Sequence, residues 1–239
     1  MAVSVDTVYQ RVLAFANKEQ RGYVTPQEFN LFANQAQMEI FEQYFYDLNQ
    51  FMRVPGNNTV YADVDDMLEE KMNIFERADG ASIVAAYQGA GGGGINKRLP
   101  DYIYRISRVE FNNAECEILN SNDFKEVRNG TPLLRSSLKR PIVNIRGNVM
   151  RAVGSNNSLI TPTGVFYFKK PDIVNWGYVV VNDKALYNDN ISTDFELHPA
   201  EETELVYKIL KFAGISIKQL DIMRAGQVQE QAQVQQEKQ

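Results

Sequence analysis

The sequence has 239 residues, of which 44% are apolar and 23% are charged, and this balance is typical of a globular protein with a substantial hydrophobic core. Its formal net charge of −5, from 25 basic and 30 acidic side chains, argues against a protein that coats DNA, because coating requires an excess of cations. A single cysteine, Cys116, excludes an intrachain disulfide, and together with the single histidine, His198, it excludes a structural zinc site.

The first ten residues lack the basic segment and apolar core of a secretion signal. No apolar run approaches the roughly 18 residues that a membrane span needs. We therefore expect a soluble protein made in a reducing cytoplasm, with no membrane contact and no cofactor.

Apolar residues recur at helical spacing in the first third of the chain. Residues 4–18 show this pattern, which predicts an amphipathic helix. A second helix is expected to start at Thr25, since Pro26 suits the first helical position and Glu28 can complete a capping box with Thr25. A third helix is expected over residues 63–79, where acidic first turns favour the helix dipole.

The second helix carries two apolar stripes over residues 29–52, and one packing partner covers only one of them. The helix is therefore either central to its own domain or presents an aromatic face to another subunit. The candidate subunit or partner contacts on this face are Phe32, Phe41, Phe45 and Met52.

Beyond a glycine-rich stretch at 89–94, the apolar residues alternate with a period of two. This alternation predicts strands at 102–111, 116–119, 141–145, 148–153, 164–169 and 177–181. A short helix is expected to end at Arg128, and a turn at Asn182 and Asp183 is expected to follow the last strand.

The chain after the strands returns to helical spacing. A helix is expected over residues 200–213 with Gly214 as its C-cap, followed by a helical piece at 217–224. The Gln-rich stretch 225–239 has too few apolar residues to bury much surface and is expected to order only against a partner.

These elements predict an α+β fold: a helical body formed by the N-terminal helices and a C-terminal helix, an inserted β-rich domain and an extended polar C-terminal tail. The expected segments are an N-terminal helical part at 1–88, a Gly-rich loop at 89–95, an inserted β-rich domain at 96–196, a C-terminal helix packing on the N-terminal helices at 197–224, and the tail at 225–239. Val228 and Val234 are the candidate partner contacts in the tail.

Charge is divided unevenly along the chain. Residues 95–170 hold 13 basic and 6 acidic side chains, whereas residues 1–94 hold 6 and 13, and residues 171–239 hold 6 and 11. Opposite charges on different segments favour contacts with copies of the chain or with another protein. A plain solvated surface is one alternative interpretation of the cationic middle. Nucleic-acid binding through residues that include Arg105, Arg108 and Arg146 is another, and it is less favoured because the basic residues are scattered over strands and loops.

No set of residues stands out as a catalytic site. A serine triad would have to use His198, whose position before Pro199 suits a helix cap, and no Gly-x-Ser-x-Gly elbow occurs. Cys116 lies beside Glu115 and Glu117, which would raise its thiol pKa, so we interpret it as a buried structural cysteine. We expect no enzymatic activity. Two enzymatic hypotheses are left open: a hydrolase that depends on His198, and a paired-carboxylate mechanism that uses acids such as Asp172, Asp194 and Glu196.

Two stretches carry a resemblance to a known family. They are residues 23–37, YVTPQEFNLFANQAQ, and residues 192–215, which begin STDFELHP. Both resemble the neck subunits of crAss-like and related short-tailed bacteriophages, proteins similar in role to the head-to-tail adaptor, or tail tubular protein A. The resemblance spans nearly the whole chain.

The resemblance implies a structural virion protein that forms a homo-oligomeric ring, typically of twelve copies, in the phage neck. Such a ring binds the portal protein and adjoining neck or tail rings, and it extends a channel through which packaged DNA passes without sequence-specific binding. The resemblance also implies assembly in the cytoplasm of the bacterial host. It supplies no catalytic, cofactor or metal residue.

Overall fold

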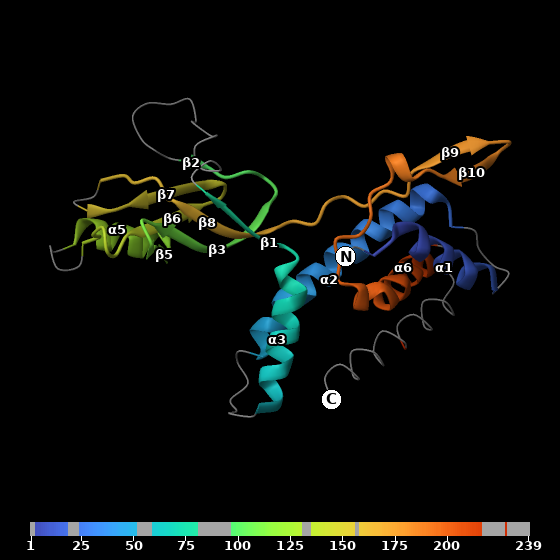
Figure 1. Ribbon diagram of the computed structural model, residues 1–239, viewed down its shortest axis with the longest axis horizontal. Coiled ribbons are helices and arrows are strands. Elements are labelled where there is room, and N and C mark those ends of the chain that lie inside the picture. Colours follow the sequence, from blue (N-terminus) through green and yellow to red (C-terminus); the bar gives the residue numbers. More distant parts are fainter. Residues whose placement is uncertain are drawn as a thin grey trace. The chain divides into compact units, whose positions relative to one another are not determined.

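The computed structural model describes residues 3–18, 24–51, 59–80, 97–130, 135–155, 158–216 and 228. Helices occupy both ends of the described chain and strands occupy its middle, which confirms the predicted α+β fold (Figure 1). The chain divides into two compact units, one formed by Met1–Ile74 with Pro171–Gln239 and the other by Phe75–Lys170. We call them the helical unit and the β unit.

The helical unit is built around α2 and α6. Its described helices are α1 (Val5–Lys18), α2 (Pro26–Phe51), α3 (Thr59–Asn73) and α6 (Glu202–Ser216), with a 3-10 turn, η3 (Pro199–Glu201), before α6. Helix α6 packs against α1 and α2, and α3 packs against α2. Apolar residues at helical spacing form the core, including Val5, Val8, Val12, Phe29, Ala33, Ala36, Ile40, Leu205 and Ile209.

Helix α2 begins where its local sequence predicts. The backbone N–H of Thr25 donates to Glu28 Oε2 at 3.0 Å, and the N–H of Glu28 donates to Thr25 Oγ1 at 3.3 Å. This reciprocal pair is the expected capping box, which satisfies two N–H groups that the first helical turn leaves without partners.

Two helix ends differ from the sequence-based expectation. Helix α3 ends at Asn73 rather than at residue 79, because Glu76–Gly80 forms strand β1 and pairs with β8. Helix α6 continues through Gly214 to Ser216, so Gly214 is a buried helical residue and not a C-cap. In both places tertiary contacts outweigh a local signal.

Residues 171–177 lie along α2 and are held there by amide side chains. Asn30 Oδ1 accepts a hydrogen bond from the backbone N–H of Trp176 at 2.7 Å, and Asn34 binds the backbone of Val174 one turn later. This segment therefore belongs to the helical unit, although its sequence neighbours are strands.

The boundaries of the inserted part shift accordingly. The sequence predicts an insertion at 96–196, whereas the contacts group Phe75–Lys170. The earlier start follows from the pairing of β1 with β8, and the earlier end follows from the attachment of residues 171–177 to α2.

Two four-stranded sheets make up the described β unit. The first has the strand order β1-β8-β3-β4 and the second β2-β7-β6-β5. The strands are β1 (Glu76–Gly80), β2 (Lys97–Arg98), β3 (Ile103–Phe111), β4 (Ala114–Glu115), β5 (Glu117–Leu119), β6 (Ile142–Arg146), β7 (Val149–Val153) and β8 (Gly164–Lys169). Only the β5–β6 pair is parallel among these described strands.

One apolar core joins the inner faces of the two sheets. Its buried side chains include Val109, Val165 and Tyr167 from the first sheet and Val143, Met150 and Ala152 from the second. Helix α5 (Ser121–Asn129) covers part of the outer face of the second sheet, where Phe124 packs with Ile142 and Val153. The sequence predicts this helix correctly, and the side chain of Asn120 caps it.

A separate hairpin completes the described strands. Strands β9 (Tyr178–Val181) and β10 (Lys184–Tyr187) pair antiparallel and lead to a 3-10 turn, η2 (Asp189–Ile191). Asn182 and Asp183 join the strands with φ angles of 49° and 61°, as a tight two-residue hairpin turn requires. The predicted turn is confirmed, and its hairpin lies in the helical unit.

Candidate interaction surfaces

Two of the aromatic residues predicted to face a partner are buried inside the helical unit. Phe41 and Phe45 pack edge to face with ring centroids 5.1 Å apart. Phe32 is half-buried, and its ring centroid lies 6.4 Å from that of Phe212 on α6. Because α3 and α6 both pack on α2, Phe41 and Phe45 are core residues rather than partner contacts.

The three arginines of the predicted cationic surface lie on two different sheets. Arg105 and Arg108 are on β3, whereas Arg146 is on β6. Arg108 pairs with Glu110 at 3.1 Å and lies 4.3 Å from the ring centroid of Phe166, so its charge is partly compensated. Neither of the two pockets described in this unit is lined by all three side chains.

Of the partner contacts predicted in the C-terminal stretch, Val228 is described and is exposed. Several other predicted positions are not described. Met52, Val234, the glycine-rich stretch 89–94 and residues 217–224 lie outside the described residues.

The root of the β9–β10 hairpin is firmly packed. Trp176 is buried, stacks on Tyr178 with ring centroids 5.8 Å apart and contacts the ring of Tyr9 at 4.4 Å. Its Nε1–H donates to Asp6 Oδ1 at 2.9 Å. The hairpin is thereby attached to α1 through an aromatic cluster.

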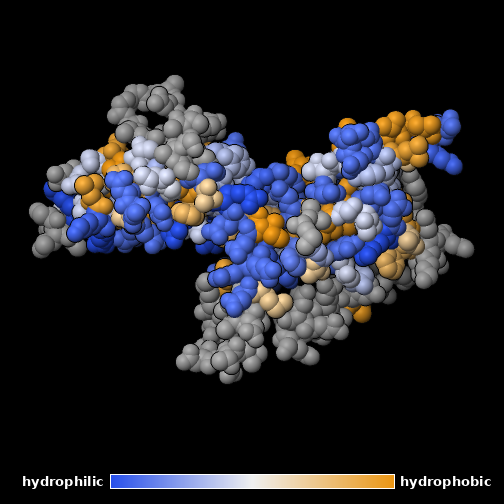
Figure 2. Space-filling view, in the orientation of Figure 1, coloured by the Kyte–Doolittle hydropathy of each residue, from blue (hydrophilic) through white to orange (hydrophobic). Residues whose placement is uncertain are grey.

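The rest of the hairpin is apolar and exposed. Val180 is 62% exposed and Leu186 is 53% exposed, and Val179 and Val181 are also exposed. These four residues, which we call the hairpin patch, form an apolar area at β9 and β10 (Figure 2). Within the described chain the two strands pair only with each other, so both outer edges offer unpaired backbone groups.

The sequence contains a signal for this patch. Three consecutive valines, Val179–Val181, place apolar groups on both faces of the strand, whereas a strand with one solvated face alternates. A two-stranded hairpin is marginally stable in water. The hairpin patch is therefore suited to being covered by another protein surface.

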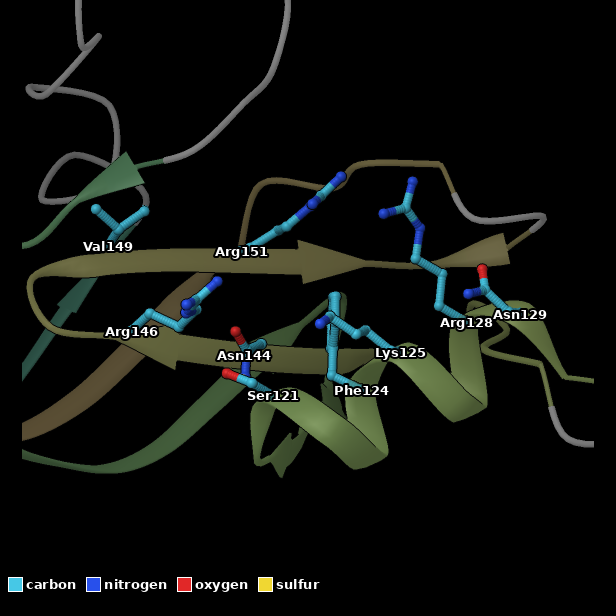
Figure 3. Close-up of a pocket in the computed structure, with 9 residues that line it drawn as sticks. All are labelled: Ser121, Phe124, Lys125, Arg128, Asn129, Asn144, Arg146, Val149 and Arg151. Carbon is cyan, nitrogen blue, oxygen red and sulfur yellow. The ribbon is translucent and has the colours of Figure 1, made fainter.

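A cationic groove lies on the outer face of the second sheet, beside α5 (Figure 3). Its volume is about 400 Å³. The lining residues are Ser121, Phe124, Lys125, Arg128, Asn129, Asn144, Arg146, Val149 and Arg151. Four of them are cations and none carries a carboxylate.

The pairing of β6 with β7 explains why these side chains meet. Asn144 lies opposite Arg151 and Arg146 lies opposite Val149, so the period of two places all four side chains on the same face. This face is turned away from the core that the two sheets share. Helix α5 is only nine residues long and covers only part of it.

Helix α5 supplies the other cations. Lys125 and Arg128 lie three residues apart and therefore share one face of the helix. In Figure 3 the guanidinium groups of Arg128 and Arg151 extend to the same side of β7. Among the four cations of the groove, only Arg146 is one of the partner contacts that the sequence analysis names. The groove itself depends on the packing of α5 against β6, which the sequence does not show.

A second group of charges is buried in the helical unit. Lys71 Nζ on α3 lies 2.6 Å from Glu201 Oε1 on η3, and Lys208 Nζ lies 3.3 Å from Glu204 Oε1 on α6. Burial raises the pKa of Glu204 to about 7, although the ammonium group of Lys208 lowers it. The first pair links α3 to η3, directly before α6, and the second lies within α6.

The residues considered for catalysis have structural partners. His198 Nδ1 accepts a hydrogen bond from the N–H of Ala200 at 3.2 Å, so the ring caps η3. Cys116 is buried, and burial together with Glu110 and Glu115 raises its thiol pKa to about 11. The direction agrees with the expectation of a structural cysteine, while Glu110 rather than Glu117 is the second acidic neighbour that contributes.

No family model matches the sequence, and no curated protein matches it either. Among the described helices, none combines the length and apolar character needed to cross a membrane. The described residues also contain no cluster of three or more His, Cys, Asp or Glu side chains suited to holding a metal ion.

Proposed function

We propose that this chain is a structural protein of a phage particle that assembles with copies of itself into a ring in the neck. The ring would connect the portal to the tail and extend the channel for packaged DNA. The resemblance to phage neck subunits implies a helical body with an inserted β-rich part, and the α+β fold, with helices at both ends of the described chain and a central β unit, is consistent with it.

The observation that carries this proposal is the hairpin patch. Its exposed apolar side chains are unfavourable in water and its open strand edges can pair with another chain, so a neighbouring copy can cover both. The root is held by Trp176, so the hairpin is ordered before it docks. An ordered arm loses less conformational entropy on binding than a disordered one.

Net charge supports contacts between unlike surfaces of neighbouring copies. The β unit, Phe75–Lys170, holds 14 basic and 8 acidic residues, a net charge of +6, while the helical unit holds 11 and 22, a net charge of −11. In a closed ring each copy offers two different surfaces to its two neighbours. Opposite potentials favour such contacts and set their orientation.

The alternative function, a nucleic-acid-binding accessory protein that uses Arg105, Arg108 and Arg146 as one surface, is less favoured. These residues lie on different sheets, and Arg108 already has an acidic partner in Glu110. A ring component remains the function that we propose.

The test is the assembly state of the purified protein, alone and mixed with the portal protein. The informative variant is Val179→Glu with Leu186→Lys, because these residues are cross-strand partners and the new ion pair preserves the hairpin while replacing two of the four apolar side chains of the hairpin patch. The matched control is Leu31→Glu, an exposed leucine on α2. Light scattering and electron micrographs would report mass and shape.

We expect rings with a central hole for the wild type and for Leu31→Glu, and monomers with an unchanged melting temperature for the double variant. A wild-type chain that stays monomeric both alone and with the portal contradicts the proposal. Rings formed equally well by the double variant would remove the hairpin patch from the interface.

A further inference from the structure

We infer that the cationic groove is a binding site for the phosphate group of a nucleotide or of a nucleic-acid strand. This inference goes beyond ring assembly, since it concerns a ligand of the β unit and uses none of the residues of the hairpin patch.

Three of the four cations that line the groove lack an anionic partner within the described chain. Lys125, Arg146 and Arg151 form no ion pair with the described part of the chain. The Nε of Arg151 is buried and finds no hydrogen-bond acceptor among the described residues. A buried donor without an acceptor costs free energy, and an anionic oxygen in the groove would supply one.

The acidic residues of α5 do not neutralise the groove. Asp123 and Glu126 are exposed and are not among the lining residues. The carboxylate of Asp123 accepts a hydrogen bond from Asn120 Nδ2 at 2.6 Å, at the start of the helix. These two carboxylates therefore do not compensate the charge of Lys125 in the groove.

The donor set fits a phosphate group. Arginine presents a planar fork of N–H groups that matches the oxygens of a phosphate, and Arg128, Arg146 and Arg151 provide three such forks. Ser121 and Asn129 add neutral polar groups at the rim. A space of about 400 Å³ admits a phosphate with its attached sugar.

An acidic segment of a second copy is the rival occupant. Asp66, Glu69 and Glu70 are exposed on α3 and could reach such a groove in a neighbouring chain. Phosphate is favoured because one phosphate group can accept from several of the guanidinium groups at once, including the buried Nε of Arg151.

The test uses the full chain and a fluorescent oligonucleotide of about 12 nucleotides, single-stranded or in a duplex. Anisotropy would be followed from about 50 to about 200 mM salt. The groove variant is Arg146→Ala with Arg151→Ala. Its matched control is Arg105→Ala with Arg108→Ala, which removes the same charge from the same unit outside the groove. Circular dichroism checks that each variant is folded.

We expect the groove variant to weaken binding about tenfold or more and to lower the salt slope by one to two, while the control stays within about twofold. The single variant Arg151→Lys, which keeps the charge but loses the fork, should weaken binding less than the double variant. Competition by ATP and by inorganic pyrophosphate shows whether the bound phosphate group belongs to a nucleotide or to a strand. Displacement of the oligonucleotide at low ATP concentration indicates a nucleotide site. Lack of displacement indicates a site for a nucleic-acid strand.

Three results would overturn the inference. The first is no binding of any phosphate probe at about 50 mM salt. The second is an equal loss in the groove variant and its control, which would show only a general effect of charge. The third is that Asp66→Lys with Glu70→Lys abolishes self-association while phosphate probes do not bind, which would assign the groove to a second copy.

Discussion

Asn34 and Val174 lie 140 residues apart in the sequence and are joined by two hydrogen bonds. The Oδ1 atom of Asn34 accepts from the N–H of Val174 at 2.8 Å, and its Nδ2 donates to the carbonyl oxygen of Val174 at 2.8 Å. One side chain on α2 thus pairs with the backbone as a neighbouring strand would. It satisfies both polar groups of a buried residue.

Replacing Asn34 by alanine should destabilise the protein. Both backbone groups of Val174 would lose their partner, and we expect the free energy of unfolding to fall by about 2 kcal/mol. Urea denaturation followed by circular dichroism measures this change. The control is Asn49→Ala, whose Nδ2 donates only to Phe45 within the same helix, and an equal loss in both variants would refute the cross-link.

Glu204 should make stability depend on pH. Burial is the main reason that its pKa is raised from 4.5 to about 7, so the folded protein binds a proton more tightly than the unfolded chain. Stability should therefore be greatest near the unfolded pKa or below and should decrease as pH rises from about 4.5 to about 7.

The variant Glu204→Gln should flatten this dependence, because glutamine does not titrate. Melting temperatures between about pH 5 and about pH 8 measure the effect. Glu70→Gln, at an exposed position on α3, serves as the control and should keep the wild-type profile. A profile unchanged in Glu204→Gln would assign the dependence to other groups.

Gly177 should tolerate no side chain. A Cβ atom there would lie 2.9 Å from the backbone carbonyl of Ile191 and closer still to its side chain. We expect Gly177→Ala to lower the free energy of unfolding by about 1–3 kcal/mol and to displace the hairpin root. At Gly164 the nearest atom to a Cβ is 3.6 Å away, so Gly164→Ala is the matched control in thermal melts. Similar stability of the two variants would contradict this expectation.

Deletion of residues 225–239 should weaken assembly without affecting the stability of the folded chain. This Gln-rich stretch has few apolar residues, so its removal should leave the melting temperature nearly unchanged. We expect weaker assembly with the adjoining ring, measured by co-sedimentation. Equal assembly by the truncated chain would remove the docking role of the stretch.

Local signals account for the elements that the sequence predicts correctly. The capping box of Thr25 and Glu28 and the turn at Asn182 and Asp183 act within a few residues. Strand β1 has no such signal: Glu76–Gly80 reads ERADG without apolar alternation, and it is a strand because it pairs with β8. Long-range pairing of this kind leaves no pattern in the segment itself.

The candidate sites are harder to predict for the same reason. The sequence pattern of α2 predicts Phe41 as a partner contact, whereas the residue is buried in a unit where α3 and α6 pack on α2. Charge marks Arg128, Arg146 and Arg151 equally among the 13 basic residues at 95–170, and their grouping in one groove follows only from the packing of α5 and the register of β6 with β7. The sequence shows which side chains are charged or apolar. Which of them are exposed, and which lie together in one site, depends on the packed structure.

The chain enters the β unit through β1 and leaves it through β8, and these strands are paired from Glu76 with Phe168 onward. The N–H of Lys169 donates to the carbonyl oxygen of Phe75 at 2.9 Å, so the entry and exit points touch. A domain whose two ends lie close together can be inserted into, or removed from, another protein with little change to the rest of the chain. Another domain whose termini lie close together can therefore replace the β unit. A short linker between residues 74 and 171 is enough to join the two parts of the helical unit.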